Sequence, residues 1–275
     1  MALATLPSGL RLAYESHGRG ETLLLIAGLG RDRRMWDAQV GPLAERLRVV
    51  AFDNRGVGRS DAPAGPYTAA QMAADAAGLL DVLEVERAHV AGASLGGLIA
   101  QELALSRPQR VSRLALLCTH PGQPLCVSMA QDTLAAIVPD PNADPVERLL
   151  GAMRLATGTR YWLDHAAELA AAARARAASL PSAQSWWAQA AAGASFSWAG
   201  RRITAPTLVL TGDEDRIVPP ANSAALRRLI PGSEGAMFAG GGHYFFSEQP
   251  GPVNRTLSEF LLCDDVTRAL SLAGA

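Results

Sequence analysis

The sequence predicts an α/β fold in which helices flank a mostly parallel β-sheet. Short apolar runs, rich in β-branched residues, alternate with amphipathic helical stretches, which is the pattern of consecutive βαβ units. Two of the runs, LLLIAG and TLVLTG, have the nearly continuous apolar character of strands buried on both faces of a parallel sheet. The 275 residues are enough to bury the core of one α/β domain of the larger kind.

The individual elements are placed by these runs and by the helical periodicity between them. Strands are expected at Leu10 to Glu15, Thr22 to Ala27, Arg48 to Phe52, Ala88 to Ala91, Arg113 to Cys118, Thr207 to Thr211 and Glu234 to Phe238. The helices between them include Thr68 to Leu83, Leu95 to Ser106 and Ala221 to Leu229.

The alternation stops between about His120 and Arg202, where alanine-rich helical sequence such as ELAAAARARAA replaces the strand signals. We interpret residues 120–202 as a helical insertion, and residues 1–119 with 203–275 as the core domain. Three prolines mark its entry, at Pro139, Pro141 and Pro145. Its tryptophans either pack against the mouth of a site or form the insertion's own core, and both interpretations stay open. They are Trp162, Trp186, Trp187 and Trp198.

Composition and charge exclude several classes of protein. With 49% hydrophobic and 19% charged residues the chain is typical of a soluble globular protein, and its net charge of -1 gives no reason to expect nucleic acid or a membrane surface as a partner. Apolar stretches such as Leu23 to Gly30 are shorter than the roughly 20 residues that span a bilayer. No secretory signal is visible at the N-terminus, so we expect a cytoplasmic protein. The oligomeric state stays open, a homo-oligomer included.

The cysteines indicate neither a disulfide framework nor a metal site. Cys118, Cys126 and Cys263 are odd in number and have no regular spacing. Cys118 and Cys126 with His120 lack a fourth ligand at zinc-site spacing. We therefore expect core thiols and a loop histidine, and no bound metal.

A candidate nucleophile stands in Gly92-Ala93-Ser94-Leu95-Gly96, directly after an expected strand and directly before a helical run. A serine on such a sharp turn needs neighbours without a Cβ two residues to either side, and glycines stand at both positions. The positive N-terminus of the following helix would help to hold an oxyanion. The alternative is that the glycines merely permit a tight turn and Ser94 caps the helix.

A serine nucleophile needs a histidine base and a carboxylate that orients the histidine. His243, in AGGGHYFFSEQP, follows the last expected strand and is the one histidine after the helical insertion. Three carboxylates compete in GDEDRIVP, namely Asp213, Glu214 and Asp215. We favour Asp215, partly because of the family resemblance given below; the other two would support the turn or face solvent.

Two backbone amides would hold the oxyanion of a hydrolytic intermediate. Leu95, the residue after the nucleophile, offers one, and Leu29 in Ala27-Gly28-Leu29-Gly30 offers the other. A simple glycine-rich turn is the alternative for this loop. A nucleotide-binding loop is disfavoured, because neither of the usual glycine motifs opens a helix there.

These motifs, together with FDNRGVGRSD at 52–61 and Met35-Trp36, resemble the α/β-hydrolase superfamily over nearly the whole chain, and its esterase and enol-lactonase group in particular. The resemblance implies an α/β-hydrolase fold, a helical cap inserted after the sixth strand, no cofactor, and a triad that falls here on Ser94, Asp215 and His243. Many members have a histidine where this chain has Ala27. The serine nucleophile argues against the dehalogenases and epoxide hydrolases of the superfamily, which use aspartate.

The function expected from these residues is hydrolysis of a small-molecule ester or lactone through an acyl-enzyme on Ser94. Gly28 and Trp36 are expected to contact the substrate, in a largely apolar pocket. Two rival functions use the same pocket: cleavage of a carbon-carbon bond or formation of peracids by the same triad, and ligand binding with little turnover, as in a receptor.

Overall fold

The computed structural model describes residues 1–140 and 142–263. Pro141, one of the prolines at the entry of the helical insertion, lies outside the described residues, and so does the end of the expected core domain, residues 264–275.

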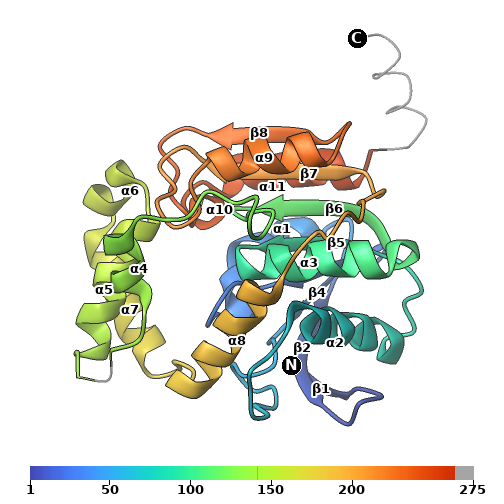
Figure 1. Ribbon diagram of the computed structural model, residues 1–275, viewed down its shortest axis with the longest axis horizontal. Helices are drawn as coiled ribbons and strands as arrows, with labels where there is room; N and C mark the ends of the chain where they lie inside the picture. Colours follow the sequence, from blue (N-terminus) through green and yellow to red (C-terminus); the bar gives the residue numbers. More distant parts are fainter. Residues whose placement is uncertain (141, 264–275) are drawn as a thin grey trace.

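One sheet of eight strands forms the centre of the described part (Figure 1). The strands are β1 (Ala2–Thr5), β2 (Arg11–His17), β3 (Thr22–Ile26), β4 (Arg48–Phe52), β5 (Ala88–Ala93), β6 (Val111–Leu117), β7 (Thr207–Gly212) and β8 (Glu234–Phe238). Their order across the sheet is β1-β2-β4-β3-β5-β6-β7-β8. The strands from β4 to β8 pair in parallel, whereas β1 and β2 pair antiparallel at one edge. The predicted α/β fold with a mostly parallel sheet is confirmed.

The N-terminal strand was not foreseen. Ala2–Thr5 pairs with β2 through backbone hydrogen bonds at the sheet edge, with Ala2 opposite Tyr14 and Thr5 opposite Arg11. Only Ala4 of the four residues is buried, so β1 lacks the continuous apolar run that identifies the central strands.

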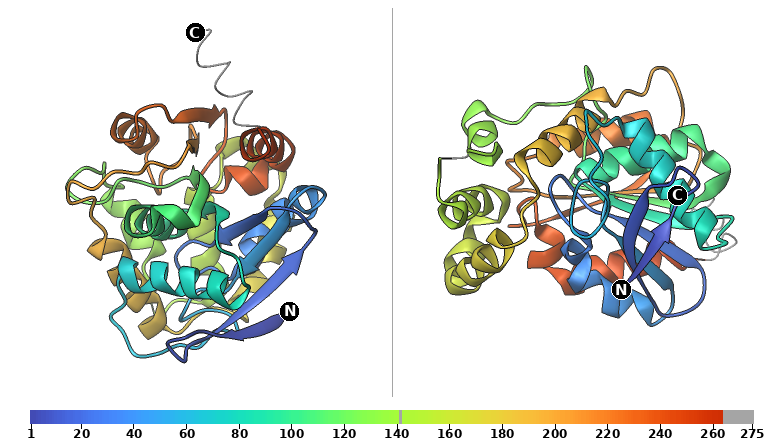
Figure 2. Two further views of the ribbon diagram at one scale, coloured as in Figure 1. Left: turned by 90° about the vertical axis from the view of Figure 1, so that its right-hand side faces the viewer. Right: turned by 90° about the horizontal axis from the view of Figure 1, so that it is seen from below.

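Helices cover both faces of the sheet. One face is covered by α2 (Ala69–Val82), α3 (Leu95–Ser106) and α9 (Ala221–Leu229), and the other by α1 (Asp37–Ala44), α10 (Phe245–Glu248) and α11 (Pro250–Leu261). Two short 3-10 helices are η1 (Arg33–Trp36) and η2 (Pro108–Arg110). Figure 2 shows the sheet between the two layers in its left-hand view. Each layer buries its own apolar cluster, so the sheet is apolar on both faces.

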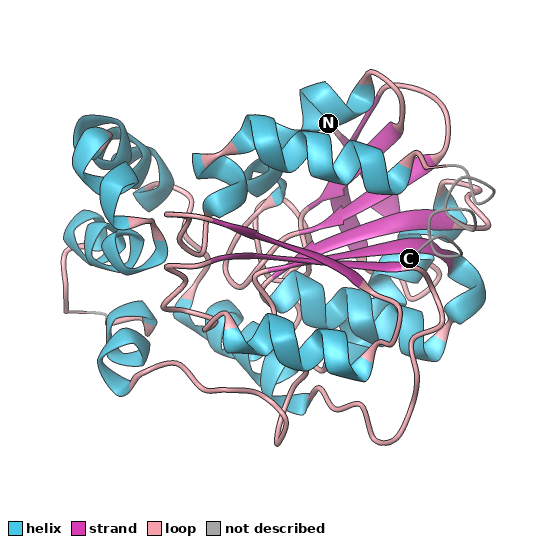
Figure 3. Cartoon of the chain, turned by 90° about the horizontal axis from the view of Figure 1, so that it is seen from above, coloured by secondary structure: helices cyan, strands magenta, loops and turns pink. Residues whose placement is uncertain are grey.

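The regular elements among the described residues between β6 and β7 are all helices. They are α4 (Gln131–Ile137), α5 (Pro145–Ala156), α6 (Thr159–Asp164), α7 (Ala166–Ala177) and α8 (Ala183–Ser195). Figures 1 and 3 show α4 to α7 standing beyond one end of the sheet, apart from the two flanking layers. The division into a core domain and a cap stays a prediction, although this placement agrees with it.

Among the described residues, no helix combines the length and the apolarity that a membrane span requires.

Candidate active site

Ser94 occupies a strained turn between β5 and α3. Its φ is 56° and its ψ is -120°, in a region that residues with side chains rarely adopt. Close packing leaves no room for side chains on either side: a Cβ on Gly92 would lie 2.2 Å from the Gly96 carbonyl oxygen, and one on Gly96 would lie 2.0 Å from that of Ile26. The glycines therefore allow the turn that presents Ser94 at the N-terminus of α3.

Asp215 and His243 form a buried pair at the ends of β7 and β8. Nδ1 of His243 lies 2.8 Å from Oδ2 of Asp215, and the two residues are 5% and 3% exposed. The other carboxylate oxygen of Asp215 accepts hydrogen bonds from the Ile217 and Val218 amides, at 2.9 and 2.8 Å. Because the carboxylate is held by two amides, it fixes the orientation of the imidazole ring.

The other carboxylates of the acid loop have different partners. Asp213 accepts a hydrogen bond from the Gly240 amide at 2.7 Å, and Glu214 accepts one from the Thr159 amide at 2.7 Å. These two residues therefore connect loops, while Asp215 alone of the three pairs with His243.

His120, the other histidine near the strand ends, has no carboxylate partner among the described residues. Its Nδ1 accepts a hydrogen bond from the Gly122 amide at 3.0 Å. Burial and the nearby His243 lower the pKa of His120 to about 4, so the ring is neutral near pH 7. The geometry agrees with His243 as the base.

A buried thiol lies near both Ser94 and His243. Cys118, at the end of β6, interacts with the His243 ring and with the backbone amide of Ser94. Ser94 is held further by its amide, which donates to the Leu117 carbonyl at 3.0 Å. Ser94 Oγ and His243 are not hydrogen-bonded to each other in the part of the chain described. In hydrolases this contact often tightens only when substrate binds.

The electrostatics of His243 are dominated by its partners. Burial disfavours the charged imidazolium, but the Asp215 carboxylate outweighs burial and raises the pKa of His243 well above 6.5. His243 therefore accepts a proton readily, as a general base must.

The loop after β3 approaches the serine closely. A Cβ on Gly28 would lie 3.3 Å from the Ser94 Cβ. The Gly28 amide donates to Met35 Sδ at 3.2 Å, and the Gly30 amide donates to Gln189 Oε1 at 2.9 Å. The Leu29 and Leu95 amides donate to no other residue within the described ranges. These two groups are thus available to bind an oxygen atom beside Ser94.

Gln189, on α8, was missed at the sequence level. Its fully buried side chain accepts from the Gly30 amide and donates to the Arg55 carbonyl oxygen at 2.8 Å. It therefore connects the helical insertion to the loop that carries Leu29. No local motif marks this residue, because both of its contacts are distant in the sequence.

Glu248 secures the loop that carries His243 and was also missed. Its Oε2 accepts hydrogen bonds from the Gly158 amide at 3.1 Å and from the Gly242 amide at 3.2 Å. Burial raises the pKa of this carboxyl above its ordinary value. Its position in the HYFFSEQP motif was the only signal in the sequence.

Trp36 does not face an open pocket in this structure. The side chain is fully buried among core residues and packs on Phe246, with ring centroids 5.3 Å apart. Its predicted contact with substrate has no support from this geometry, because η1 directs the ring into the core. Gly28, by contrast, lies beside Ser94, where a substrate contact is feasible.

Each of the two interpretations left open above fits one tryptophan of the helical insertion, and the other two tryptophans fit neither. Trp186 packs against the loop after β3 that carries the predicted oxyanion donor Leu29 (residues 27–31, the oxyanion loop), where a Cβ on Gly30 would lie 3.0 Å from its ring. Trp162 packs in the insertion's own apolar cluster, Trp198 is buried against the α3 face of the sheet, and Trp187 is 52% exposed.

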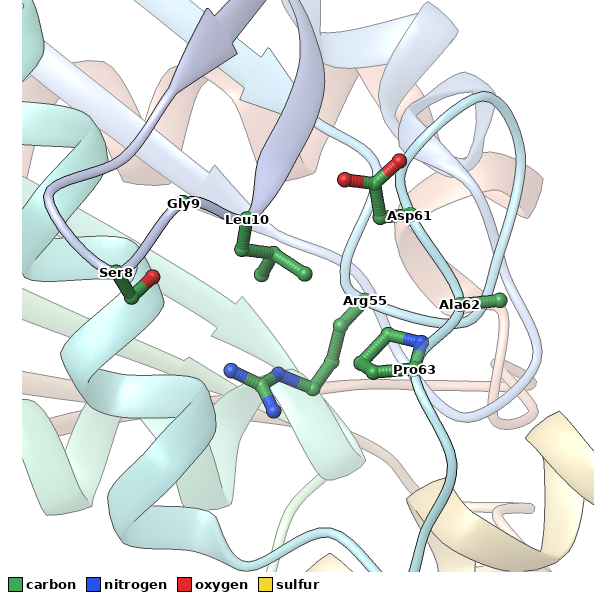
Figure 4. A pocket seen from close by; sticks show the side chains of 7 residues that line it. All are labelled: Ser8, Gly9, Leu10, Arg55, Asp61, Ala62 and Pro63. Atoms are coloured by element: carbon green, nitrogen blue, oxygen red, sulfur yellow. The ribbon is translucent and has the colours of Figure 1, made fainter.

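A surface hollow beside the β1–β2 turn contains none of the predicted site residues (Figure 4). Its charged side chains already have partners: Arg55 binds Asp75, and Asp61 binds Arg11. Within the described residues, no group of three or more histidine, cysteine, aspartate or glutamate side chains is placed to hold a metal ion. The candidate site is therefore the strand edge around Ser94.

Comparison with known proteins agrees with this architecture. Residues 21–250 match the family described as alpha/beta hydrolase fold. The chain belongs to the α/β-hydrolase family. A protein of Azorhizobium caulinodans, named provisionally as the carbamate hydrolase RutD, is 32% identical over 256 residues, which cover 90% of this chain and 94% of that protein.

Solved structures of other α/β-hydrolases resemble this chain over nearly its full length. The enol-lactonase from Burkholderia xenovorans LB400 superposes with a TM-score of 0.83 at 25% identity, covering 95% of this chain and 100% of the enol-lactonase. A meta-cleavage product hydrolase from Pseudomonas fluorescens IP01 superposes with a TM-score of 0.81 at 25% identity, covering 94% and 97%. This α/β-hydrolase is thus a hydrolase, as the sequence predicted.

Proposed function

We propose that this α/β-hydrolase cleaves a carboxylic ester or lactone through an acyl-enzyme on Ser94. The observation that carries the proposal is the combination of a serine in a strained turn with the buried pair of Asp215 and His243 at the same edge of the sheet. Strain persists only where the surrounding structure imposes it, and it is concentrated at functional sites. A helix cap alone would not need such a turn.

In the proposed reaction Ser94 Oγ attacks the carbonyl carbon and His243 Nε2 takes the hydroxyl proton. His243 then returns this proton to the leaving alkoxide as the carbon–oxygen bond breaks. A water molecule, deprotonated by His243, attacks the acyl carbon, and Ser94 leaves with the proton. Asp215 keeps the Nδ1 proton in place and stabilises the imidazolium throughout.

The Leu29 and Leu95 amides would bind the oxyanion of both tetrahedral intermediates. Leu95 directly follows Ser94, and Leu29 directly follows Gly28, which lies beside Ser94. Neither amide donates to another residue in the described part of the chain. Removing one such donor from a serine hydrolase costs roughly a hundred- to a thousandfold in kcat. Because the donors are backbone groups, Ala27 in place of histidine leaves them intact.

The relatives support carbonyl chemistry of this kind and widen the range of substrates to test. The name of the enol-lactonase gives a lactone as its substrate class. The name of the Azorhizobium protein gives a carbamate. Both compounds have a carbonyl carbon that a serine can attack. The meta-cleavage product hydrolase makes carbon-carbon cleavage the second candidate, since the same triad would serve it.

The test is turnover of a short p-nitrophenyl ester by the wild type and by Ser94→Ala, with a serine-directed phosphonate as a covalent label. We expect turnover and labelling in the wild type, and the loss of both in Ser94→Ala. Ser197→Ala, which changes an exposed serine, is the matched control and should retain both. A wild type that neither turns over the ester nor takes the label would overturn the proposal.

Product analysis separates the remaining candidates. Hydrolysis of a vinylogous diketone by a protein that leaves esters intact would favour carbon-carbon cleavage. Tight binding of a ligand without steady-state turnover would favour the receptor.

A further inference from the structure

Two arginines from separate parts of the chain meet at Tyr244, the residue after His243. Arg31 comes from the loop after β3, and its guanidinium carbon lies 5.3 Å from the centre of the Tyr244 ring. Arg176 comes from α7 in the helical insertion and lies close enough to the Tyr244 hydroxyl to act on its pKa. The His243 and Tyr244 rings are 5.7 Å apart, so the two guanidinium groups lie close to the proposed base.

Neither arginine is neutralised by a carboxylate side chain. Among the described residues, neither Arg31 nor Arg176 forms a salt bridge. Asp32 is near enough to act on both, but its carboxylate binds Arg34 at 2.6 Å. The Asp215 carboxylate is occupied by His243 and two amides.

The pKa values of Arg176 and of Tyr244 respond to this excess of positive charge. Burial and the repulsion from Arg31 lower the pKa of Arg176 to about 10. Burial alone would raise the pKa of the Tyr244 phenol, but Arg31, Arg176 and His243 outweigh it and lower that pKa. Two partly buried cations near the same tyrosine repel each other, and an anion bound by both would relieve the repulsion and the loss of hydration.

The cluster is positioned to reach a substrate bound at Ser94. Arg31 lies two residues after Leu29, and its amide donates to the Gly28 carbonyl at 3.1 Å, which places it in the oxyanion loop itself. Tyr244 is anchored by its amide, which donates to the Ala156 carbonyl at 3.0 Å. A guanidinium group presents its N–H donors as a planar fork that matches the two oxygens of a carboxylate.

We propose that Arg31, Arg176 and the Tyr244 hydroxyl form a subsite for a carboxylate on the substrate, so that this enzyme prefers esters or lactones that carry a free carboxylate group. The inference rests on the proposed hydrolysis at Ser94 and names its substrate class. The carboxylate would lie on the side of the scissile carbonyl that faces the helical insertion. Arg176 thereby gives the insertion a direct part in substrate selection.

The test compares two methyl esters of matched shape. Monomethyl succinate carries a carboxylate, whereas methyl levulinate has a neutral methyl ketone at the same place. We expect the wild type to have a kcat/KM at least tenfold higher for monomethyl succinate. Arg176→Gln and Arg31→Gln should each lower this ratio roughly 10- to 100-fold, mainly through KM, because a hydrogen bond to a charged group contributes about 1.5–3 kcal/mol. Arg174→Gln, on the exposed side of the same helix, is the matched control and should retain the wild-type ratio.

The outcomes separate this inference from the proposed hydrolysis. Turnover of both esters that depends on Ser94, with equal kcat/KM, would overturn the carboxylate subsite and leave the hydrolysis standing. If neither ester is turned over and Ser94 takes no phosphonate, the hydrolysis fails and the subsite is tested by calorimetry with succinate and succinamide. Succinate binding that weakens at least tenfold in Arg176→Gln supports the subsite, and equal affinities for both compounds overturn it. If either arginine variant fails to fold by circular dichroism, Tyr244→Phe replaces it in the same assays.

Discussion

The edge of the sheet and the helical insertion contribute to one site by different means. At the sheet edge, turns that follow β5, β7 and β8 hold Ser94, Asp215 and His243, and the last two are almost fully buried. The insertion contributes isolated side chains, Gln189 and Arg176, each of which contacts a loop far away in the chain. We infer from this difference that the core holds the proposed reacting groups. The insertion would position the loop after β3 and contribute to the selection of substrate.

The largest effect expected at the sheet edge is that of Asp215→Asn. The amide would hold the imidazole in the wrong tautomer, as in other serine hydrolases, so kcat/KM for an ester should fall roughly 10⁴-fold. Because neutral His243 is the active form, wild-type activity should rise with pH through the pKa of His243, which Asp215 raises above 6.5. Loss of the carboxylate should lower this pKa and move the acid limb of the pH–rate profile to lower pH.

The control for this prediction is Asp213→Asn. In the described part of the chain the Asp213 carboxylate accepts a hydrogen bond from the Gly240 amide and none from His243, so its variant should retain most of the activity. Equal losses in the two variants, or an acid limb that stays in place in Asp215→Asn, would contradict the assignment of the acid.

A second test at the sheet edge concerns stability. In Gly96→Ala the new methyl group would lie 2.0 Å from the Ile26 carbonyl oxygen, so β3 or α3 must shift. Overpacking of this kind costs roughly 3 kcal/mol. We expect a fall in Tm of roughly 6 to 12 °C by calorimetry, at about 2 to 4 °C per kcal/mol. An unchanged Tm would mean that the turn around Ser94 is looser than its geometry indicates.

In the helical insertion the corresponding test is Gln189→Ala. The Gly30 amide and the Arg55 carbonyl would both lose a buried partner, at a cost of roughly 1–3 kcal/mol. Because Gln189 acts on the oxyanion loop and not on substrate, we expect kcat to fall roughly tenfold while KM changes little and the pH profile keeps its position.

Gln184→Ala, on an exposed position of α8, is the matched control. A rise in KM with unchanged kcat would show that Gln189 binds substrate instead of positioning the loop.

The same difference between the core and the helical insertion explains which parts of the structure the sequence could predict. Central strands such as β3 and β7 are nearly continuous apolar runs, and the strained turn needs glycines at fixed distances from Ser94, so local patterns identify both. The choice of Asp215 among three carboxylates was harder. Its neighbours Asp213 and Glu214 accept hydrogen bonds from the Gly240 and Thr159 amides, and no local pattern reveals these contacts.

The contributions of the helical insertion could not be predicted in this way. Arg176 stands in an alanine-rich run beside other arginines, and only the fold brings it to Tyr244 and Arg31. Trp36 shows the opposite case, since its place after the oxyanion loop suggested a substrate contact, yet packing on Phe246 buries it completely. Contacts between distant segments are decided by packing, which periodicity does not encode.

The smallest effect, and one of opposite sign, is expected inside the helical insertion. Gly151 lies on an exposed face of α5, and a Cβ there would meet no heavy atom within 4 Å other than those of its chain neighbours and of its own helix backbone. Alanine loses less conformational entropy than glycine in a helix, so Gly151→Ala should stabilise α5 by roughly 0.5–1 kcal/mol. If the insertion unfolds together with the core, Tm should rise by roughly 1 to 4 °C. If the insertion unfolds separately from the core, Tm should stay constant while limited proteolysis around α5 slows. The two regions would then differ in stability as well as in their contributions to the site. A lower Tm with faster proteolysis would contradict this prediction and show that position 151 requires glycine for a reason other than the packing around α5.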